Sequence, residues 1–97
     1  DTEIGKNTYL DNQVHIGHNV KIGSNCMIAG QVGFAGSCRV GNNVSIGGQA
    51  GISGHLQIGN NVKIGGGSGV IKDIKDNQVV MGYPAVPFKD FIKNWKK

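Results

Sequence analysis

Residues 10–34 read LDNQVHIGHNVKIGSNCMIAGQVGF, and an apolar residue returns at every sixth position of this stretch. The same phase continues in both directions without an insertion, giving a series of twelve apolar residues: Ile4, Leu10, Ile16, Ile22, Ile28, Phe34, Val40, Ile46, Ile52, Ile58, Ile64 and Val70. A second series, four residues after the first, is mostly small or aliphatic: Thr8, Val14, Val20, Cys26, Val32, Cys38, Val44, Ala50, Leu56, Val62, Ser68 and Ile74. The two series predict short strands whose alternate side chains face one core.

Glycine and asparagine predict a turn after each strand. Of the 97 residues, 17 are glycine, and a helix would not tolerate this density of glycine and asparagine. Five hexads combine the two residues in a tripeptide that favours a positive φ at its asparagine: Gly5-Lys6-Asn7, Gly17-His18-Asn19, Gly23-Ser24-Asn25, Gly41-Asn42-Asn43 and Gly59-Asn60-Asn61. Strands and turns alternating at a period of six indicate a solenoid whose repeats bury their faces by stacking.

The repeat resembles the left-handed parallel β-helix of hexapeptide acyltransferases over residues 4 to about 75. In that family three hexads make one triangular coil, so twelve hexads imply about four coils. We therefore expect an all-β solenoid in which residues eighteen apart lie above one another, separated by roughly the 4.8 Å strand spacing.

The pattern breaks after Val70, because position 76 of the series is an aspartate. We expect the solenoid to end near residue 75. The two prolines within residues 81–87 predict an extended crossing segment. After it, Phe88, Phe91, Ile92 and Trp95 recur at spacings of three or four, which predicts a short amphipathic helix. The expected parts are a β-helix over 1–75 and a crossing segment with a short C-terminal helix over 76–97.

The charge is concentrated at the C-terminus. The net charge is +4, and four lysines gather near the end of the chain: Lys89, Lys93, Lys96 and Lys97. They either solvate the terminal helix or face an acidic partner. No aromatic residues interleave with a basic patch in the repeat region, so nucleic-acid binding has little support.

The remaining composition indicates a cytoplasmic protein. No run of 18 apolar residues and no signal-peptide pattern occurs, so an integral membrane segment is not expected. Cys26 and Cys38 occupy inward positions of the second series, and we expect two buried reduced thiols rather than a disulfide or a metal pair.

Two histidines fall on one predicted edge of the solenoid. Gly36 lies eighteen residues after His18, and Gly54, beside His55, lies eighteen further. Acyl transfer needs a base for the attacking nucleophile and a donor for the developing oxyanion, and a histidine with an unobstructed glycine N–H can supply both. Spacing alone is also compatible with two unrelated surface histidines. His15 is expected at an outward corner without a catalytic role.

Three stretches of the sequence support acyl transfer more strongly than the spacing of the histidines does. They are Leu10-Asp11-Asn12-Gln13-Val14-His15-Ile16-Gly17-His18-Asn19, Ala29-Gly30-Gln31-Val32-Gly33-Phe34-Ala35-Gly36-Ser37 and Ile52-Ser53-Gly54-His55-Leu56. Together they resemble the UDP-3-O-(3-hydroxyacyl)glucosamine N-acyltransferases of lipid A biosynthesis, a step of lipopolysaccharide assembly.

The resemblance implies a role for five residues. His18 would be the general base that deprotonates the 2-amine of the glucosamine, and the Gly36 N–H would contribute to the oxyanion hole. His55 would line the same cleft and touch the substrate or the thioester arm. Asp11 would accept a hydrogen bond that orients His18. Asn12 would bind the substrate or hold a turn, and we favour the turn.

The resemblance also implies partners. The family acts as a homotrimer on a UDP-sugar substrate, with active sites between neighbouring prisms, and takes its 3-hydroxyacyl chain from acyl carrier protein. Phosphopantetheine would arrive on this acidic donor, so no cofactor and no metal of its own is expected for this chain. Family members carry a uridine-binding domain before the solenoid, and nothing like it precedes Asp1. We therefore expect a fragment of a longer enzyme, weakly active or inactive alone.

Three other interpretations remain. Gly82-Tyr83-Pro84-Ala85 resembles the exit sequence of acetyl-CoA-dependent hexapeptide acetyltransferases that act on sugars or amino acids. A trimeric histidine-zinc enzyme of the γ-carbonic anhydrase kind would need three imidazoles around one metal, but His18 and His55 are 37 residues apart, which is not a whole number of coils. A purely structural solenoid would be insensitive to His18→Ala.

Overall fold

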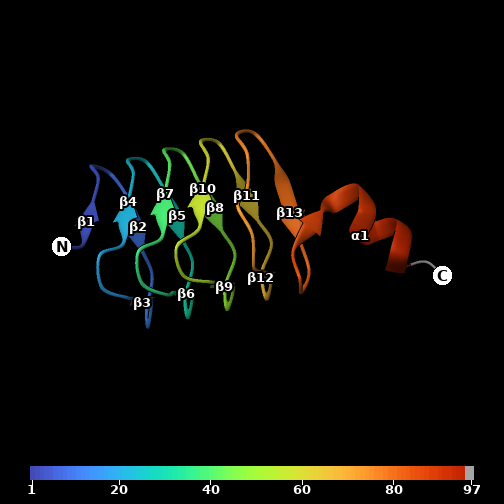
Figure 1. The fold of residues 1–97 in the computed structure, drawn as a ribbon, viewed down its shortest axis with the longest axis horizontal. Coiled ribbons are helices and arrows are strands. Elements are labelled where there is room, and N and C mark those ends of the chain that lie inside the picture. The colour runs from blue at the N-terminus through green and yellow to red at the C-terminus, as the bar shows by residue number, and fades with distance from the viewer. Residues whose placement is uncertain (96–97) are drawn as a thin grey trace.

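The computed structural model describes residues 1–95, which form a parallel β-solenoid of about four turns followed by one helix (Figure 1). Twelve strands of two residues recur at the predicted period of six, from β1 (Glu3–Ile4) to β12 (Gly69–Val70). Each strand pairs in parallel with the strand eighteen residues away, as Lys21 does with Arg39. This is the arrangement of a left-handed β-helix of hexapeptide repeats, and the predicted fold class is confirmed.

Three sheets form the faces of the prism. Sheet A consists of β1, β4 (Lys21–Ile22), β7 (Arg39–Val40) and β10 (Gln57–Ile58). Sheet B consists of β2 (Tyr9–Leu10), β5 (Met27–Ile28), β8 (Ser45–Ile46), β11 (Lys63–Ile64), β13 (Val79–Met81) and β14 (Val86–Pro87). Sheet C consists of β3 (His15–Ile16), β6 (Gly33–Phe34), β9 (Gly51–Ile52) and β12.

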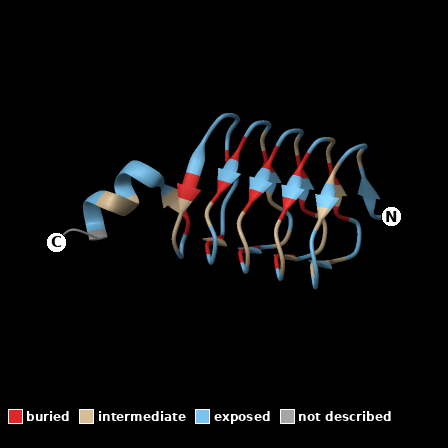
Figure 2. Ribbon diagram, turned by 180° about the vertical axis from the view of Figure 1, so that it is seen from behind, coloured by how far each residue is buried: buried red, intermediate tan, exposed pale blue. Residues whose placement is uncertain are grey.

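Both predicted series of inward residues form the core (Figure 2). The first contributes nine buried side chains: Ile22, Ile28, Phe34, Val40, Ile46, Ile52, Ile58, Ile64 and Val70. The second contributes Val20, Cys26, Val32, Cys38, Val44, Ala50, Val62 and Ser68. Cys26 and Cys38 are free and fully buried, as expected of small apolar side chains.

Each corner from Asn7 to Gly67 contains one residue with a positive φ, and these residues recur every six positions; the shortened corner after Val70 contains none, and the next is Asn77. The five asparagines expected in this conformation all adopt it: Asn7, Asn19, Asn25, Asn43 and Asn61. Four corners use Gln13, Gln31, Gln49 and Asn77, and two use Ser37 and His55. The backbone N–H at such a position donates to a carbonyl of the coil before it, as Asn43 does to Ser24 at 2.9 Å.

The solenoid extends past its expected end near residue 75. Ile74 forms a bridge with Ile58, and β13 pairs in parallel with β11. Lys63 of β11 is paired with Ser45, 18 residues before it, and with Val79, only 16 residues after it. The corner after Val70 is therefore two residues shorter than the others. This shift of phase explains the polar residue at position 76, because Ile74, expected in the second series, takes that place in the first series, and buried Val80 follows six residues later.

Residues 81–87 form a hairpin, and the prediction of an extended crossing segment is wrong. Gly82–Ala85 make a turn, after which β14 returns antiparallel to β13, with Met81 opposite Val86. The reversal uses a φ of 102° at Gly82, which only glycine adopts readily.

The predicted C-terminal helix is present as α1 (Phe88–Trp95), packed on β13 and β14. Lys89 and Lys93 are exposed on it, whereas Lys96 and Lys97 lie outside the described residues. Within residues 1–95, no helix has the length and apolar character needed to cross a bilayer.

Candidate functional site

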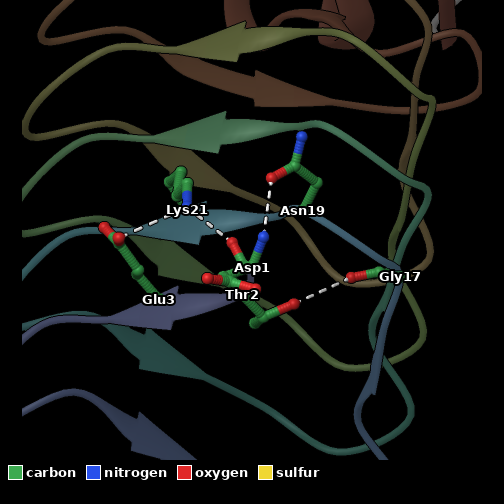
Figure 3. Close-up of polar contacts among 6 residues, drawn as sticks. All are labelled: Asp1, Thr2, Glu3, Gly17, Asn19 and Lys21. Carbon is green, nitrogen blue, oxygen red and sulfur yellow. Dashed lines mark hydrogen bonds and ion pairs between the residues drawn. The ribbon is translucent and has the colours of Figure 1, made fainter.

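The candidate site lies on the prism edge where sheet C turns into sheet A. We call it the His18 edge and define it as the stacked corners 17–19, 35–37 and 53–55. The first residues of the chain run beside it, because the Thr2 hydroxyl donates to Gly17 O at 3.3 Å and the Asp1 amino group donates to Asn19 Oδ1 at 3.0 Å (Figure 3). The shortened corner after Val70 follows it in the next coil.

The His18 side chain lies directly against the backbone of Gly36. A Cβ built on Gly36 would lie 2.6 Å from His18 Nε2 and 2.8 Å from Cε1, well inside the ordinary contact range. The imidazole therefore occupies the space that any side chain at position 36 would need. The structure brings together these two residues of the predicted site.

The Gly36 backbone N–H has no hydrogen-bond acceptor among the described residues. The corner between sheets A and B differs, because side chains of the next coil accept from the equivalent N–H groups. These bonds join Ser24 N to Asn42 Oδ1 at 2.8 Å, Asn42 N to Asn60 Oδ1 at 2.8 Å and Asn60 N to Asp76 Oδ1 at 2.7 Å. On the His18 edge the matching residue of the next coil is Gly54, which has no side chain to accept a hydrogen bond. The Gly36 N–H is therefore available to a ligand.

His55 lies one coil above Gly36 and is bonded to it. The His55 backbone N–H donates to Gly36 O at 3.1 Å, and its side chain is exposed. Gly36 therefore contacts both histidines, His18 through the imidazole and His55 through the main chain. An exposed imidazole and an N–H without an acceptor within residues 1–95 lie on one edge, and they are the two groups, a base and an oxyanion donor, that acyl transfer to an amine or a hydroxyl uses.

Cys38 lies behind this edge in the core. Its thiol is 2.9 Å from Ser53 O and 3.0 Å from Ala35 O. Burial raises the pKa of the Cys38 thiol, and backbone hydrogen bonds from Leu56 and His55 only partly oppose this effect. The thiol is therefore protonated at neutral pH and has a packing role.

Asp11 lies on a different edge and does not contact His18. It follows sheet B, one hexad before the corner that holds His18, and its Oδ1 accepts from Asn12 N at 2.7 Å. Within residues 1–95 no hydrogen bond joins Asp11 to His18, so the expected orienting contact is not formed inside one protomer. The Asn12 carbonyl accepts from Gln31 N at 3.0 Å, the bond that the equivalent corner residues also make, and the role of its side chain stays a prediction.

The outer face of sheet C forms a bare surface beside the His18 edge. Its outward positions are His15, Gly33, Gly51 and Gly69, and a Cβ at Gly33 or Gly51 would meet nothing within 4 Å. His15 therefore lies on a strand and not at the expected corner. Sequence reasoning missed this face, although a count of outward residues at steps of eighteen would have revealed three glycines in one column.

An apolar groove of about 580 Å³ follows the outer face of sheet B. Its lining includes exposed Tyr9, Met27, Val79 and Phe88, together with Asp11 at its rim. Among the described residues neither histidine of the His18 edge lines it, so in one protomer the apolar surface and the candidate base are on different faces.

The described residues of a single chain contain no group of three or more histidine, cysteine, aspartate or glutamate side chains close enough together to hold a metal ion. The zinc interpretation therefore needs residues from more than one chain.

Comparison with known proteins gives the same fold and a family. The bacterial transferase hexapeptide (six repeats) family matches residues 1–36 and again residues 37–72. Among curated proteins no sequence matches the chain.

Several solved structures superpose on the chain. UDP-N-acetylglucosamine O-acyltransferase (LpxA) from Moraxella catarrhalis RH4 is 33% identical, with a TM-score of 0.86 over 97% of this chain and 38% of that one. Soybean serine acetyltransferase is 31% identical, with a TM-score of 0.80 over 89% of this chain and 40% of that one. The H141N mutant of perosamine N-acetyltransferase from Caulobacter crescentus, in complex with CoA and GDP-perosamine, is 24% identical, with a TM-score of 0.88 over 90% of this chain and 41% of that one, and shows the fold alone.

The chain thus spans about two fifths of the length of these proteins. The family match covers most of its solenoid, in the same register of hexads that the structure shows. The chain belongs to the bacterial transferase hexapeptide family.

Proposed function

We propose that the protein is an acyltransferase whose active site is built on the His18 edge. The observation that carries the proposal is the contact between His18 and Gly36, in which an exposed imidazole lies against a glycine whose N–H is available to a ligand. Family membership supports a transferase, and this pairing of groups supports acyl transfer in particular.

The proposed reaction uses these groups in one step of addition and one of elimination. The acceptor amine attacks the thioester carbonyl, and His18 takes the proton that the nitrogen loses. The carbonyl oxygen becomes an oxyanion and accepts a hydrogen bond from Gly36 N–H. The carbonyl then re-forms, the carbon–sulfur bond breaks, and the proton passes from His18 to the leaving thiolate.

For the substrates, we propose transfer of a 3-hydroxyacyl chain from acyl carrier protein to the 2-amine of UDP-3-O-acylglucosamine in lipid A biosynthesis. The resemblance of the three stretches around His18, Gly36 and His55 supports this choice, as does the likeness to an acyltransferase of a UDP-amino sugar. Exposed Lys89 and Lys93 on α1 suit an acidic carrier protein.

We further propose a homotrimer with the site between protomers. The His18 edge is open along its length, and a narrow prism has no second layer of its own to cover the site. A neighbouring protomer would supply the missing wall. Asp11 would then have to be tested in the assembled protein, because it does not reach His18 within one chain.

A second candidate is acetyl transfer from acetyl-CoA to an amino sugar or an amino acid. It is favoured by the 31% identity to soybean serine acetyltransferase and by the Gly82–Ala85 segment, which closes the solenoid as a tight turn. The two candidates share the base and the oxyanion donor and differ in the donor substrate.

A donor comparison tests the proposal. The full-length protein would be given 3-hydroxyacyl-[acyl carrier protein] with UDP-3-O-acylglucosamine and, separately, acetyl-CoA with amino sugars and serine. Turnover in the first assay supports the lipid A reaction, and turnover only in the second supports the alternative. Turnover in neither, with stoichiometric zinc in the purified protein, would favour the zinc enzyme.

A further inference from the structure

The corner residues with positive φ follow a rule that two residues break. Of the eleven that are not glycine, six are asparagine, which tolerates this conformation well, and three are glutamines whose side chains are bonded to one another from coil to coil. The exceptions are Ser37, with a φ of 65°, and His55, with a φ of 62°. Both lie on the His18 edge, so the departures from the turn rule coincide with the candidate site.

Ser37 is the more costly exception. Histidine, like asparagine, is enriched among residues with positive φ, whereas serine has no such preference. A residue held in a sparsely populated conformation persists when the surroundings require it, and such residues cluster at functional sites. The Ser37 backbone makes the same bond as its counterpart Asn43, since its N–H donates to His18 O at 2.9 Å and that of Asn43 donates to Ser24 O at 2.9 Å. The backbone hydrogen bond of this corner therefore does not require a serine.

Five of the corner side chains on the other edges are bonded to one another from coil to coil, whereas among the described residues no such bond is formed by Asn7, Asn25 or Asn43. Gln31 Nε2 donates to Gln13 Oε1 at 2.8 Å, and Gln49 Nε2 donates to Gln31 Oε1 at 2.9 Å. Asn61 Nδ2 donates to Asn77 Oδ1 at 3.1 Å. Within the described part of the chain, neither the Ser37 hydroxyl nor the His55 imidazole has such a bond. Both groups are therefore available to a ligand on the His18 edge.

We infer that Ser37 contacts the acyl acceptor and that its small hydroxyl side chain leaves room for the acceptor between His18 and His55. The inference rests on the proposed acyl transfer. Ser37 follows Gly36 directly and is bonded to the main chain of His18, so a ligand held by these two residues also meets Ser37. A hydroxyl both donates and accepts, which suits a neutral polar group such as a sugar hydroxyl or an amide.

The test exchanges serine and asparagine at two matched corners of the full-length protein. Ser37→Asn is expected to raise the unfolding midpoint by roughly 3 °C, because asparagine relieves the backbone strain. The same substitution is expected to raise the acceptor KM about tenfold, with a smaller change in kcat, because the longer side chain fills the acceptor space. Asn43→Ser, the reverse exchange away from the site, is expected to lower the midpoint and leave kcat and KM unchanged.

A second variant separates bulk from the hydroxyl. Ser37→Gly relieves the strain and keeps the space, so it is expected to raise the acceptor KM only about threefold, the effect of one lost neutral hydrogen bond. A more stable Ser37→Asn protein with unchanged acceptor KM would overturn the inference while leaving the proposed function intact. A Ser37→Asn protein that is no more stable than wild type would overturn its premise of strain. A wild-type protein that transfers no acyl group to any acceptor would overturn the proposed function and, with it, this inference.

Discussion

Gly36 gives the sharpest prediction about the geometry of the site. In a Gly36→Ala protein the new Cβ would lie 2.6 Å from His18 Nε2, 2.8 Å from Cε1 and 3.1 Å from Cδ2. Ordinary carbon contacts begin near 3.5 Å, so the imidazole must move away by about 1 Å. A displacement of this size in a reacting group costs about a hundredfold in rate, or about 2.7 kcal/mol of activation free energy.

The fold should be almost unaffected by Gly36→Ala. The group that moves is the far end of an exposed side chain, and Gly36 does not have a positive φ, so we expect the free energy of unfolding to change by less than about 1 kcal/mol. The matched control is Gly48→Ala, at the same position of a hexad on another edge, where a Cβ would meet only Gly30 O at 3.4 Å.

The assay is steady-state acyl transfer by the full-length protein, with thermal unfolding measured in parallel. We expect Gly36→Ala to lose about a hundredfold in kcat and Gly48→Ala to keep wild-type kinetics. A Gly36→Ala protein with wild-type kcat would show that the contact between His18 and Gly36 has no bearing on the reaction.

Four further outcomes are expected. Asp11→Asn should lower kcat about tenfold in the assembled protein if Asp11 orients His18 there, and an assembled variant with wild-type kcat would remove that role. His55→Gln should raise the acceptor or donor KM about tenfold with a smaller effect on kcat, measured by varying each substrate in turn. The pKa of the Cys38 thiol is raised in the folded state, so the thiol of the unfolded chain ionises first as the pH rises. The free energy of unfolding should therefore be constant below about pH 8 and fall at higher pH. Urea titrations of wild type and Cys38→Ala from about pH 7 to 10 should show this loss in the wild type and not in the variant. Phe34→Ala should destabilise the solenoid by about 3–5 kcal/mol, since Phe34 is fully buried, and a urea midpoint equal to that of wild type would contradict its core position.

The fold could be predicted from the sequence because a strict repeat leaves few other arrangements for the strands and turns. A period of six with two inward residues per hexad determines the strands, the corners and the core, and these agree with the structure through Val70. The expected end of the solenoid was wrong because one corner is two residues shorter than the others, so Ile74, expected in the second inward series, continues the first series and Val80 follows it. A strict count of six cannot detect such a change of phase.

The candidate site was predictable only where residues share an edge. His18, Gly36 and His55 were placed together by their spacing of about eighteen, and the structure joins them through Gly36. The proposed contact of Asp11 with His18 came from resemblance, and one protomer does not form it, because corners one hexad apart lie on different edges. The strain at Ser37 was not visible either, since its significance depends on the φ values of all the other corners.

The most direct test of the central claim is acyl transfer from 3-hydroxyacyl-[acyl carrier protein] to UDP-3-O-acylglucosamine by the full-length protein, wild type against His18→Ala. If His18 is the base, the substitution lowers kcat by about a hundredfold or more, while the unfolding midpoint and the sedimentation of the assembly stay unchanged. Equal kcat values for the two proteins would show that His18 is not the base.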